Sequence, residues 1–523
     1  MRAFYGSRFC QTDKTGKSSR FFCKTLFQTA GFPARGFLVF PPENAYNSFV
    51  HSIAEESGIM SGLSEKYIRM TTEPVRRLVF RLAVPTVISM LVTALYNIAD
   101  TFFVGRIGTQ ATAGVGLVFP VMTIMQAFGF FFGQGSGNYI SRKLGSREMD
   151  RAETMAATGN LSALLFGAVF AVSGILLRPV LLPLLAGANA DRLDALTLSY
   201  AGDYLTVILI GAPFLCMSCV LNNQLRFQGN AFFSMIGLVS GAVINCALDP
   251  LLIFVFDLQV TGAALATILS QFISCALLFV GTLRSDSLKI RLRKFRPTLY
   301  YLKNIAVGGF PSLSRQGLAS VAVLCLNAAA GSACTANPDA AIAAFSVVGK
   351  IMMFGFSALL GFGQGFQPVC GFNYGARKYA RVRESYLFVV KAGILFLLAV
   401  SAVGFLLADR AVALFRDDPD VIAVGRIAMR CQCVTFPLMA VVTMTNMLYQ
   451  NIGRVVGATL LAVARQGIMF IPVVLILPRL FAEPVWGVYL AQPMADVFAF
   501  ALAVPLAVRM MRELKQKENG PEK

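Results

Sequence analysis

Two aspartates interrupt apolar stretches of the sequence, where a charged side chain is costly. Asp100 lies near the end of a long apolar run, in ALYNIADTFFVG, and Asp249 lies in AVINCALDP, one helical turn after Asn245. Thr267 follows in the next apolar run. Two close carboxylates in an apolar medium cannot both stay charged cheaply, so such a pair favours binding a proton or, with amide and hydroxyl oxygens, a sodium ion. The less specific interpretation is that Asp100 sits in the aqueous interface and that Asp249 only ends a helix before Pro250.

A second set of ionisable residues lies in the C-terminal half and mixes both signs of charge. It contains three arginines and one aspartate: Arg315, Arg430, Arg465 and Asp496. Because opposite charges inside a membrane tend to pair, we expect Asp496 to bind Arg465 or Arg315. Contact between these residues and a bound substrate is the alternative. His51 is the only histidine and lies near the N-terminus, so the apolar body offers no His-based metal site, proton relay or Ser-His catalysis.

The polar residues are carried by long apolar runs. The chain has 523 residues, of which 56% are hydrophobic and 14% are charged, against about 25% charged in a typical soluble domain. Runs of roughly 18 or more apolar residues recur, and each is long enough to cross a bilayer as a helix. We therefore predict an all-α polytopic membrane protein with twelve transmembrane helices. They cover residues 78–104, 113–137, 153–177, 196–222, 232–256, 262–283, 302–330, 340–366, 384–408, 421–449, 454–477 and 486–510.

The loops between the predicted helices indicate their orientation. Basic residues crowd the segments 142–151, 284–303 and 377–383, whereas 257–261 and 331–340 contain no Lys or Arg. By the positive-inside rule, the basic loops and both termini lie in the cytoplasm. The net charge of +19 is thereby explained without nucleic acid as a partner.

This orientation places the polar residues of the N-terminal half at one level. The helices that contain Asp100 and Asp249 run outward, and the helix that contains Thr267 runs inward. At about 1.5 Å per residue, the three side chains lie at similar depth in the outer half of the membrane, with Asn245 roughly one turn deeper. We therefore predict that Asp100, Asn245, Asp249 and Thr267 form one ion-binding pocket.

The two halves of the chain repeat one another. GQGSGNYISRKLGSR at 133–147 corresponds to GQGFQPVCGFNYGAR at 363–377, with GQG, a later Gly and an Arg at the same spacing. An even number of helices returns each half to its starting side. The two six-helix lobes are therefore parallel and related by a pseudo-two-fold axis along the membrane normal, as in one class of secondary transporters. The GQG glycines are predicted to allow close helix approach or bending, with a proline as a further candidate hinge. These residues are Gly133, Gly135, Gly363, Gly365 and Pro85.

The predicted organisation has five parts. Residues 70–283 form the N-lobe with helices one to six, and residues 304–510 form the C-lobe with helices seven to twelve. Residues 284–303 form a basic cytoplasmic linker between the lobes, and residues 511–523 form a cytoplasmic tail. Residues 1–69 lack a spanning run and a helical period. We interpret them as a disordered extension or as the product of an upstream start codon.

Several motifs together resemble the MATE (multidrug and toxic compound extrusion) family, most of all its bacterial DinF-like and MepA-like branch. The motifs are YNIADTFFVG, GQG…SRKLG, RFQGN, N-x-x-x-LDP and RQG…IP, and the similarity extends from about residue 70 to 510. The resemblance implies that Asp100, Asn245 and Asp249 bind the coupling ion, with Thr267 matching a hydroxyl of the family. The NorM-like branch also has acidic residues in helices seven and ten. This chain has Arg315 in helix seven and no carboxylate in helix ten, which favours coupling in the N-lobe.

The resemblance implies a multidrug efflux antiporter of the bacterial cytoplasmic (inner) membrane that works by alternating access. A proton or sodium gradient drives the export of amphipathic, mostly cationic small molecules, with no enzyme activity and no cofactor besides the coupling ion. We expect a monomer whose partners are its substrates and the lipid bilayer. The arginines of the C-terminal half keep open an exporter or flippase of a lipid-linked or anionic metabolite. A membrane scaffold or receptor without transport is the third and least favoured class.

Overall fold

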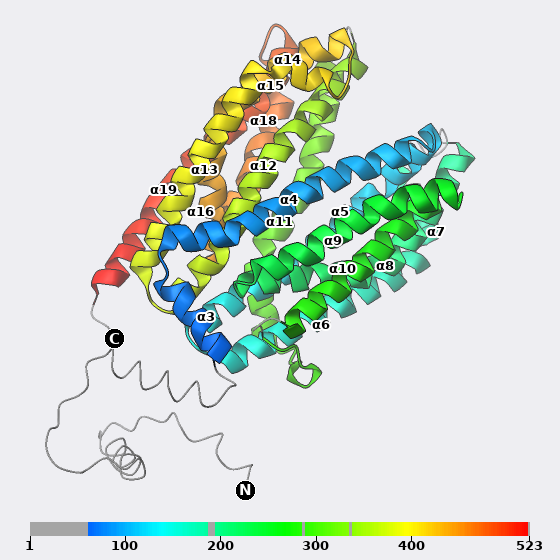
Figure 1. Ribbon diagram of the computed structural model, residues 1–523. Coiled ribbons are helices and arrows are strands. Elements are labelled where there is room, and N and C mark those ends of the chain that lie inside the picture. The colour runs from blue at the N-terminus through cyan, green and yellow to red at the C-terminus, as the bar shows by residue number, and fades with distance from the viewer. Residues whose placement is uncertain (1–60, 187–193, 285–287, 334–336, 521–523) are drawn as a thin grey trace, which may run out of the picture. The chain divides into compact units, whose positions relative to one another are not determined.

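The computed structural model of the chain describes residues 61–186, 194–284, 288–333 and 337–520. The chain divides into a unit Met1–Ser61 and a unit Gly62–Lys523, and the description below concerns the second unit. Every regular element of the described residues is a helix (Figure 1). Residues 1–60, which make up most of the predicted N-terminal extension, lie outside the described residues, as do residues 521–523 of the predicted tail.

The N-terminal half contains six helices that are long and apolar enough to span a membrane. They are α4 (Val75–Gly105), α5 (Thr109–Gly145), α6 (Met149–Leu176), α8 (Ala195–Phe227), α9 (Ala231–Pro250) continued by the π-helical turn η2 (Leu251–Val255), and α10 (Gln259–Arg284). Within this half, α8 packs against α5, α6 and α10, whereas α9 packs against α4 and α10. The short helix α7 (Arg178–Ala186) follows α6.

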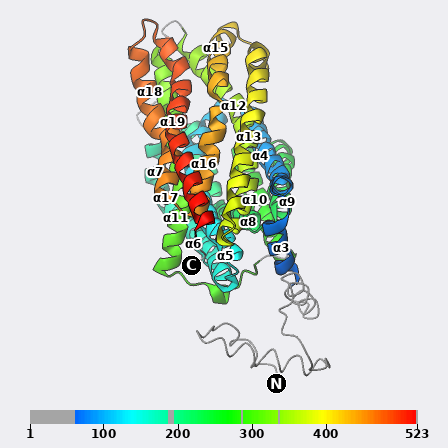
Figure 2. The ribbon, with the colours of Figure 1, turned by 90° about the vertical axis from the view of Figure 1, so that its left-hand side faces the viewer.

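The C-terminal half contributes the remaining spans. They are α11 (Leu299–Ala333), α12 (Pro338–Gly375), α13 (Tyr379–Leu406), the pair α15 (Pro419–Thr435) and α16 (Leu438–Ile452), the run α17 (Val455–Val463), η4 (Ala464–Met469), α18 (Phe470–Ile476) and η5 (Leu477–Arg479), and α19 (Pro484–Asn519). The pair α15 and α16 is bent by 56°, and α16 packs against both α13 and α19 (Figure 2). With this pair counted as one span, the described residues hold 12 candidate spans. The predicted twelve-helix, two-lobe fold is confirmed.

Prolines and π-helical turns interrupt the regular hydrogen bonding of several of these helices. Pro85 lies inside α4, where its ring removes one helical hydrogen bond. Pro250 is the last residue of α9, and the chain continues there as the π-helical turn η2. A second π-helical turn, η4, carries Arg465. Single π-turns inside helices often occur at functional positions, because they re-aim the side chains that follow.

The repeat brings the two lobes into reciprocal backbone contact at the end that carries the basic loops, here called the basic end. A Cβ added to Gly145 of α5 would collide with the carbonyl of Phe372, and one added to Gly375 of α12 would collide with the carbonyl of Arg142. Because Gly145 and Gly375 are equivalent in the repeat, the same contact occurs twice. Away from the basic end, towards α7 and α14 (Ala408–Ala413), the two helix bundles diverge (Figure 1).

The predicted packing glycines fall into two pairs. Gly135 of α5 approaches the backbone of Ile305 in α11, and Gly365 of α12 approaches the backbone of Ala83 in α4, so both lie at contacts between the lobes. The other pair packs within its own lobe. Gly133 meets the side chain of Asn223, and Gly363 meets the side chain of Met447.

A short helix before the first span also contacts both lobes. α3 (Ser61–Thr72) begins inside the segment 1–69 that the sequence assigns to an N-terminal extension. The Arg147 guanidinium, in the loop after α5, lies 4.3 Å from the ring centroid of Tyr67. Lys378, in the loop after α12, donates from Nζ to the carbonyl of Thr71 at 3.0 Å. The charge of Lys378 is favourable there, because it lies at the C-terminal end of a helix. Basic loops from both halves of the chain therefore contact α3.

We expect the Gly375→Ala variant to be less stable than the wild type. Its methyl group must separate two backbones that touch, which is an overpacking cost of about 1–3 kcal/mol. Gly349→Ala on the same helix is the matched control, because nothing lies within 4 Å of its added Cβ. That control should be neutral or stabilised by about 0.4–1 kcal/mol. Thermal unfolding of both purified variants in detergent measures the difference, and equal midpoints would show that the lobes are not closely packed at Gly375.

Candidate functional site

Asp249 and Asn245 of α9 lie against Thr267 of α10 in the interior of the N-lobe. Their side chains are buried, with exposed fractions of 0%, 1% and 4% respectively. The amide of Asn245 satisfies its neighbours when its Nδ2 donates to Asp249 Oδ2 at 3.0 Å and its Oδ1 accepts from the backbone N–H of Thr267 at 3.3 Å. α9 does end at Pro250, as the less specific interpretation of Asp249 proposed, but the carboxylate is fully buried.

Asp100 joins this group from α4. It is partly buried and interacts electrostatically with Asp249. No Lys or Arg of the described residues interacts with either carboxylate. The structure therefore brings together all four residues that the sequence placed in one pocket. We call Asp100, Asn245, Asp249 and Thr267 the N-lobe carboxylate cluster.

Two tyrosines border this cluster, and sequence reasoning missed both. Tyr96 of α4 and the buried Tyr204 of α8 interact with both carboxylates, and the hydroxyls of both approach the hydroxyl of Thr267. Tyr96 precedes Asp100 by one helical turn, so its spacing was a usable signal. Nothing in the sequence around Tyr204 marks it, because only the packing of α8 against α10 brings it to the cluster.

The chemistry of the cluster follows from its unpaired oxygens. Asp100 Oδ1 and Asp249 Oδ1 are buried without a hydrogen-bond partner among the described groups. An unsatisfied buried acceptor costs about 1–3 kcal/mol, and more when it is charged. A proton, or a sodium ion held by carboxylate, amide and hydroxyl oxygens, removes that cost. Because the donors of the cluster are oxygens and include no thiolate or imidazole, they suit a proton or a monovalent cation better than a transition metal.

A buried ion pair lies in the C-lobe. Arg465 Nε is 3.1 Å from Asp496 Oδ1, and the two side chains are 17% and 3% exposed. Gln492, one turn before Asp496 on α19, donates from Nε2 to the same oxygen at 2.8 Å. The Arg465 guanidinium also lies 4.9 Å from the ring centroid of Phe356 on α12. The structure thus places Arg465, rather than Arg315, against Asp496.

The other two arginines that the sequence singled out in the C-terminal half, Arg315 and Arg430, have different surroundings. Arg315 lines a pocket of ≈ 40 Å³ together with Arg465, but it has no hydrogen-bond or ion-pair partner among the described residues. Arg430 lies elsewhere, with its Nη2 3.4 Å from Asp409 Oδ2. Asp409 is also 3.5 Å from Arg426, so Arg430 belongs to a partly exposed ionic cluster and not to the pocket.

Comparison with known proteins identifies the family. A family model described as MatE matches residues 85–251 and 317–476, which is more than half of the chain. The chain belongs to the MatE family. It is therefore a membrane transporter and not an enzyme, as the sequence predicted.

Individual proteins resemble the whole chain in both sequence and structure. The multidrug export protein MepA of Staphylococcus saprophyticus is 27% identical over 435 residues, which are 82% of this chain and 93% of that protein. A multidrug resistance MATE family transporter of the MOP superfamily, solved in an outward-facing conformation, superposes with a TM-score of 0.80 at 27% identity, covering 86% and 98% of the two chains. A MOP superfamily transporter from Pyrococcus furiosus, described as having a binding pocket of reversed polarity, gives 0.79 at 27% identity, covering 87% and 99%.

Another polar site in this MatE protein surrounds Arg226, which belongs to the RFQGN motif and is only 1% exposed. Its Nη1 donates to Gln364 Oε1 at 2.7 Å, and its Nη2 donates to Asn223 Oδ1 at 2.6 Å. Gln134 donates to the same Asn223 oxygen at 3.1 Å and accepts from Gln367 at 3.3 Å. Gln134 and Gln364 are the glutamines of the two GQG motifs. The repeat therefore brings Gln364 directly, and Gln134 through Asn223, into the hydrogen-bond network of one buried arginine between the lobes. The motif match did not reveal this role.

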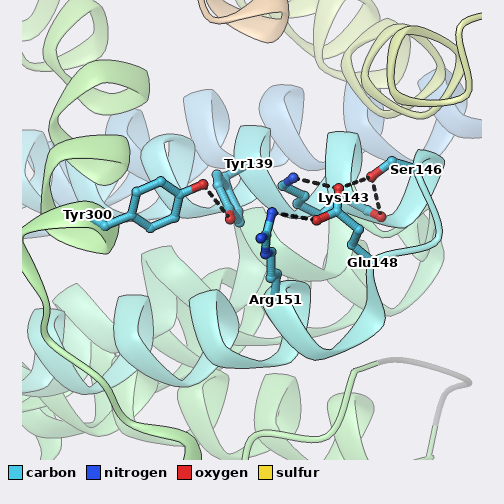
Figure 3. A network of polar contacts seen from close by, with 6 residues as sticks. All are labelled: Tyr139, Lys143, Ser146, Glu148, Arg151 and Tyr300. Carbon is cyan, nitrogen blue, oxygen red and sulfur yellow. Dashed lines mark hydrogen bonds and ion pairs between the residues drawn. The ribbon is translucent and has the colours of Figure 1, made fainter. Parts of the chain in front are cut away.

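Figure 3 shows a further polar network at the basic end of the N-lobe. Lys143 Nζ lies 2.6 Å and Arg151 Nη1 lies 2.7 Å from the carboxylate of Glu148. The hydrogen bond from Lys143 holds the pKa of Glu148 below its usual range. The hydroxyl of Tyr139 on α5 lies 3.3 Å from that of Tyr300 on α11, so this network also reaches the C-lobe.

We expect Asp496→Asn to destabilise the protein, because it leaves the positive charge of Arg465 buried without its partner. Removing one member of a buried ion pair costs about 3–5 kcal/mol. The double variant Arg465→Met with Asp496→Leu should recover most of that loss, since it removes both charges and keeps apolar volume. Thermal unfolding in detergent measures both variants. A single variant as stable as the wild type would mean that Asp496 contributes no compensation to Arg465.

Proposed function

We propose that this MatE protein is a cation-coupled multidrug efflux antiporter, which exports amphipathic, mostly cationic compounds by alternating access. The observation that carries this proposal is the N-lobe carboxylate cluster, in which two carboxylates share a buried site without a cationic side chain. The name of the MepA relatives, multidrug export protein, supports the substrate class. The sequence contains no phosphate-binding loop of the G-x-x-x-x-G-K-[ST] type, so an ion gradient is the favoured source of energy.

The cluster can convert ion binding into a change of force between two helices. Asp100 lies on α4 and Asp249 lies on α9, and one bound proton or sodium ion cancels one of their two formal negative charges. α4 contacts α9 in its own lobe and α12 in the other lobe. The occupancy of the cluster therefore changes the electrostatic repulsion between α4 and α9, and the contact of α4 with α12 transmits that change to the C-lobe.

Pro85 is the proposed hinge for this movement. It lies inside α4, one residue before Thr86, whose hydroxyl donates to the carbonyl of Gly361 on α12 at 2.6 Å. Gly365 of α12 meets the backbone of Ala83 two residues before Pro85. A bend of α4 at Pro85 therefore changes a close contact between the lobes and not only the shape of one helix.

We infer that the structure represents the state in which the cytoplasmic side is closed. In support, the reciprocal Gly145 and Gly375 contacts and the cluster around Arg226 join the lobes towards the basic end. The positive-inside rule assigns the basic loops and both termini to the cytoplasm. The proposed location is the bacterial cytoplasmic membrane, in which a monomer is sufficient because each chain carries two complete lobes.

An exporter or flippase of a lipid-linked or anionic metabolite is the second candidate. The Pyrococcus furiosus transporter is described as having a binding pocket of reversed polarity, which supports considering an anionic substrate for this chain. Recognition of a diphosphate needs several free cations around one site. Here Asp496 neutralises Arg465 and Asp409 neutralises Arg430, which leaves Arg315 as the one unpaired member of that set. This charge balance favours the multidrug antiporter.

We expect Asp100→Asn to abolish most ion-driven export, since it removes the charge that the coupling ion must neutralise. Loss of a coupling free energy of about 1–3 kcal/mol lowers ion-dependent efflux about 5- to 150-fold. The measurement is efflux of a fluorescent organic cation from proteoliposomes under an imposed proton or sodium gradient.

Asp203→Asn is the matched control for this experiment. Asp203 is a carboxylate on α8 of the same lobe, but it is 51% exposed and lies 3.7 Å from Arg178. Export by this control should match the wild type under both gradients. Wild-type export by a folded Asp100→Asn variant would remove Asp100 from the coupling site.

We expect Arg226→Met to loosen the contact between the lobes at the cytoplasmic side. The variant loses charge-assisted hydrogen bonds worth about 1.5–3 kcal/mol each. Amide hydrogen exchange in the segments 133–147 and 363–377 should therefore become at least about tenfold faster. Arg284→Met, at the exposed end of α10, is the control. Unchanged exchange in both segments would show that Arg226 does not hold the lobes together.

A further inference from the structure

The pocket lined by Arg315 contains a positive charge that nothing in the described protein compensates. Arg315 and Arg465 contribute two positive charges, and Asp496 contributes one negative charge at 3.1 Å from Arg465. The sum of +2 and −1 leaves a net charge of +1. Arg315 is only partly exposed and has no partner among the described residues, so this charge belongs to its guanidinium.

The position of the pocket makes an uncompensated charge costly. Arg315 lies near the middle of α11, and Phe356 lies near the middle of α12, so the pocket is far from both ends of these spans. Ionisable residues at such depth normally pair with another charge or face a pathway that a ligand uses. In transporters built from repeats, substrate sites lie near this level. The depth therefore points to a ligand rather than to a solvated surface arginine.

The remaining lining residues suit an oxyanion. Thr443 and Gln466 line the pocket, and their side chains have no hydrogen-bond partner among the described residues. A hydroxyl and an amide can donate hydrogen bonds beside the planar fork of Arg315, which matches a carboxylate in a bidentate manner. Phe356, Met439 and Val442 supply an apolar wall next to these donors. The combination fits an anionic group attached to an apolar body.

The pocket size restricts what enters it. Its volume of ≈ 40 Å³ is far below the roughly 300–1,000 Å³ of pockets that enclose a whole drug-sized ligand. It has room for one small polar group, while the apolar body of the ligand remains outside. A single negative charge matches the net charge of the pocket, whereas a phosphate monoester dianion would leave an excess.

The two lobes carry unpaired charge of opposite sign, at different positions of the repeat. When α4 and α11 are aligned on Pro85 and Pro311, an apolar residue, Leu326, falls at the position of Asp100. Arg315 in turn has no basic counterpart on α4, where the aligned residue is a serine. The duplicated fold therefore carries unpaired negative charge in one lobe and unpaired positive charge in the other.

From these observations we propose that the pocket around Arg315 is a subsite for the carboxylate of an amphipathic, monoanionic or zwitterionic substrate. The proposal deepens the proposed function, because it adds carboxylate-bearing compounds to the exported substrates. Arg315 binds the carboxylate, and Gln466 and Thr443 donate hydrogen bonds to it. Arg465 remains with Asp496 and positions the pocket wall through Phe356.

Binding of two dansyl probes to the purified protein in lipid nanodiscs tests this proposal. Dansylglycine carries a carboxylate, whereas dansylamide has the same fluorophore without the charge, and empty nanodiscs correct for partition into lipid. The wild type should bind dansylglycine at least about tenfold more tightly than dansylamide. Arg315→Met should reduce the affinity for dansylglycine to that for dansylamide and leave dansylamide unchanged. Equal affinities of the wild type for both probes would overturn the proposal.

Two further variants separate a local effect from a general one. Gln466→Glu keeps both arginines but places a carboxylate inside the pocket, so it should also abolish the preference for dansylglycine. Arg426→Met is the control, since it removes an arginine of the same lobe that lies outside the pocket, and Asp409 retains Arg430. Loss of dansylglycine binding in Arg426→Met, or its persistence in Arg315→Met, contradicts the assignment.

Competition distinguishes a monoanion from a phosphate. Benzoate should displace dansylglycine at lower concentration than phenyl phosphate does, and the reverse order would contradict the charge count of the pocket. These binding measurements need no ion gradient. Failure of ion-driven efflux would refute the proposed antiporter without affecting them, and an antiporter that binds both probes equally would refute only the carboxylate subsite.

Discussion

The cost of holding an uncompensated charge among apolar helices is the constraint on which this structure depends. A bilayer offers no water to satisfy a carboxylate or a guanidinium, so each one must find a partner or face a ligand. Arg465 has such a partner, since its Nε lies 3.1 Å from Asp496 Oδ1. Asp100 and Asp249 lie in one site without a cationic side chain. Two like charges can share such a site at low cost only when a cation binds between them. The same cost that makes the Arg465 pair a structural feature makes the N-lobe carboxylate cluster a candidate for coupling.

Close backbone packing is the second constraint, and it links the lobes. Gly145 and Gly375 allow α5 and α12 to touch without intervening side chains, and the repeat produces this contact in two symmetry-related copies. Arg226 then lies in a site that only amides satisfy, since Gln364 and Asn223 accept from it and no carboxylate of the described chain does. Amide hydrogen bonds cost less to break than a buried ion pair. A contact of this kind suits an interface that opens and closes in the proposed alternating-access cycle.

Duplication followed by divergence accounts for the different polar sites of the two lobes. The shared helical plan keeps the two halves compatible at their interface, while the polar residues inside each half have diverged. In the N-lobe, Asn245 bridges Asp249 and the backbone of Thr267 beside the carboxylates. In the C-lobe, Thr443 and Gln466 surround an arginine with hydrogen-bond donors. Under the two proposals, one lobe binds a cation and the other an anionic group, although both use the same arrangement of helices.

The sequence by itself determined the number of spans, their approximate ends and the two-lobe plan, because length, apolar content and a repeated GQG motif are local properties. It also placed Asp100, Asn245, Asp249 and Thr267 in one pocket. The direction of each helix and the rise per residue convert a residue's position in the sequence into its depth in the membrane. Depth does not specify which faces of different helices meet. Only the tertiary structure therefore decided that Tyr204 borders the carboxylates and that Asp496 binds Arg465 and leaves Arg315 unpaired. It also decided that the two GQG glutamines belong to the hydrogen-bond network of Arg226. Each of these depends on rotation about a helix axis and on contacts between distant segments, which side-chain packing sets and sequence spacing does not.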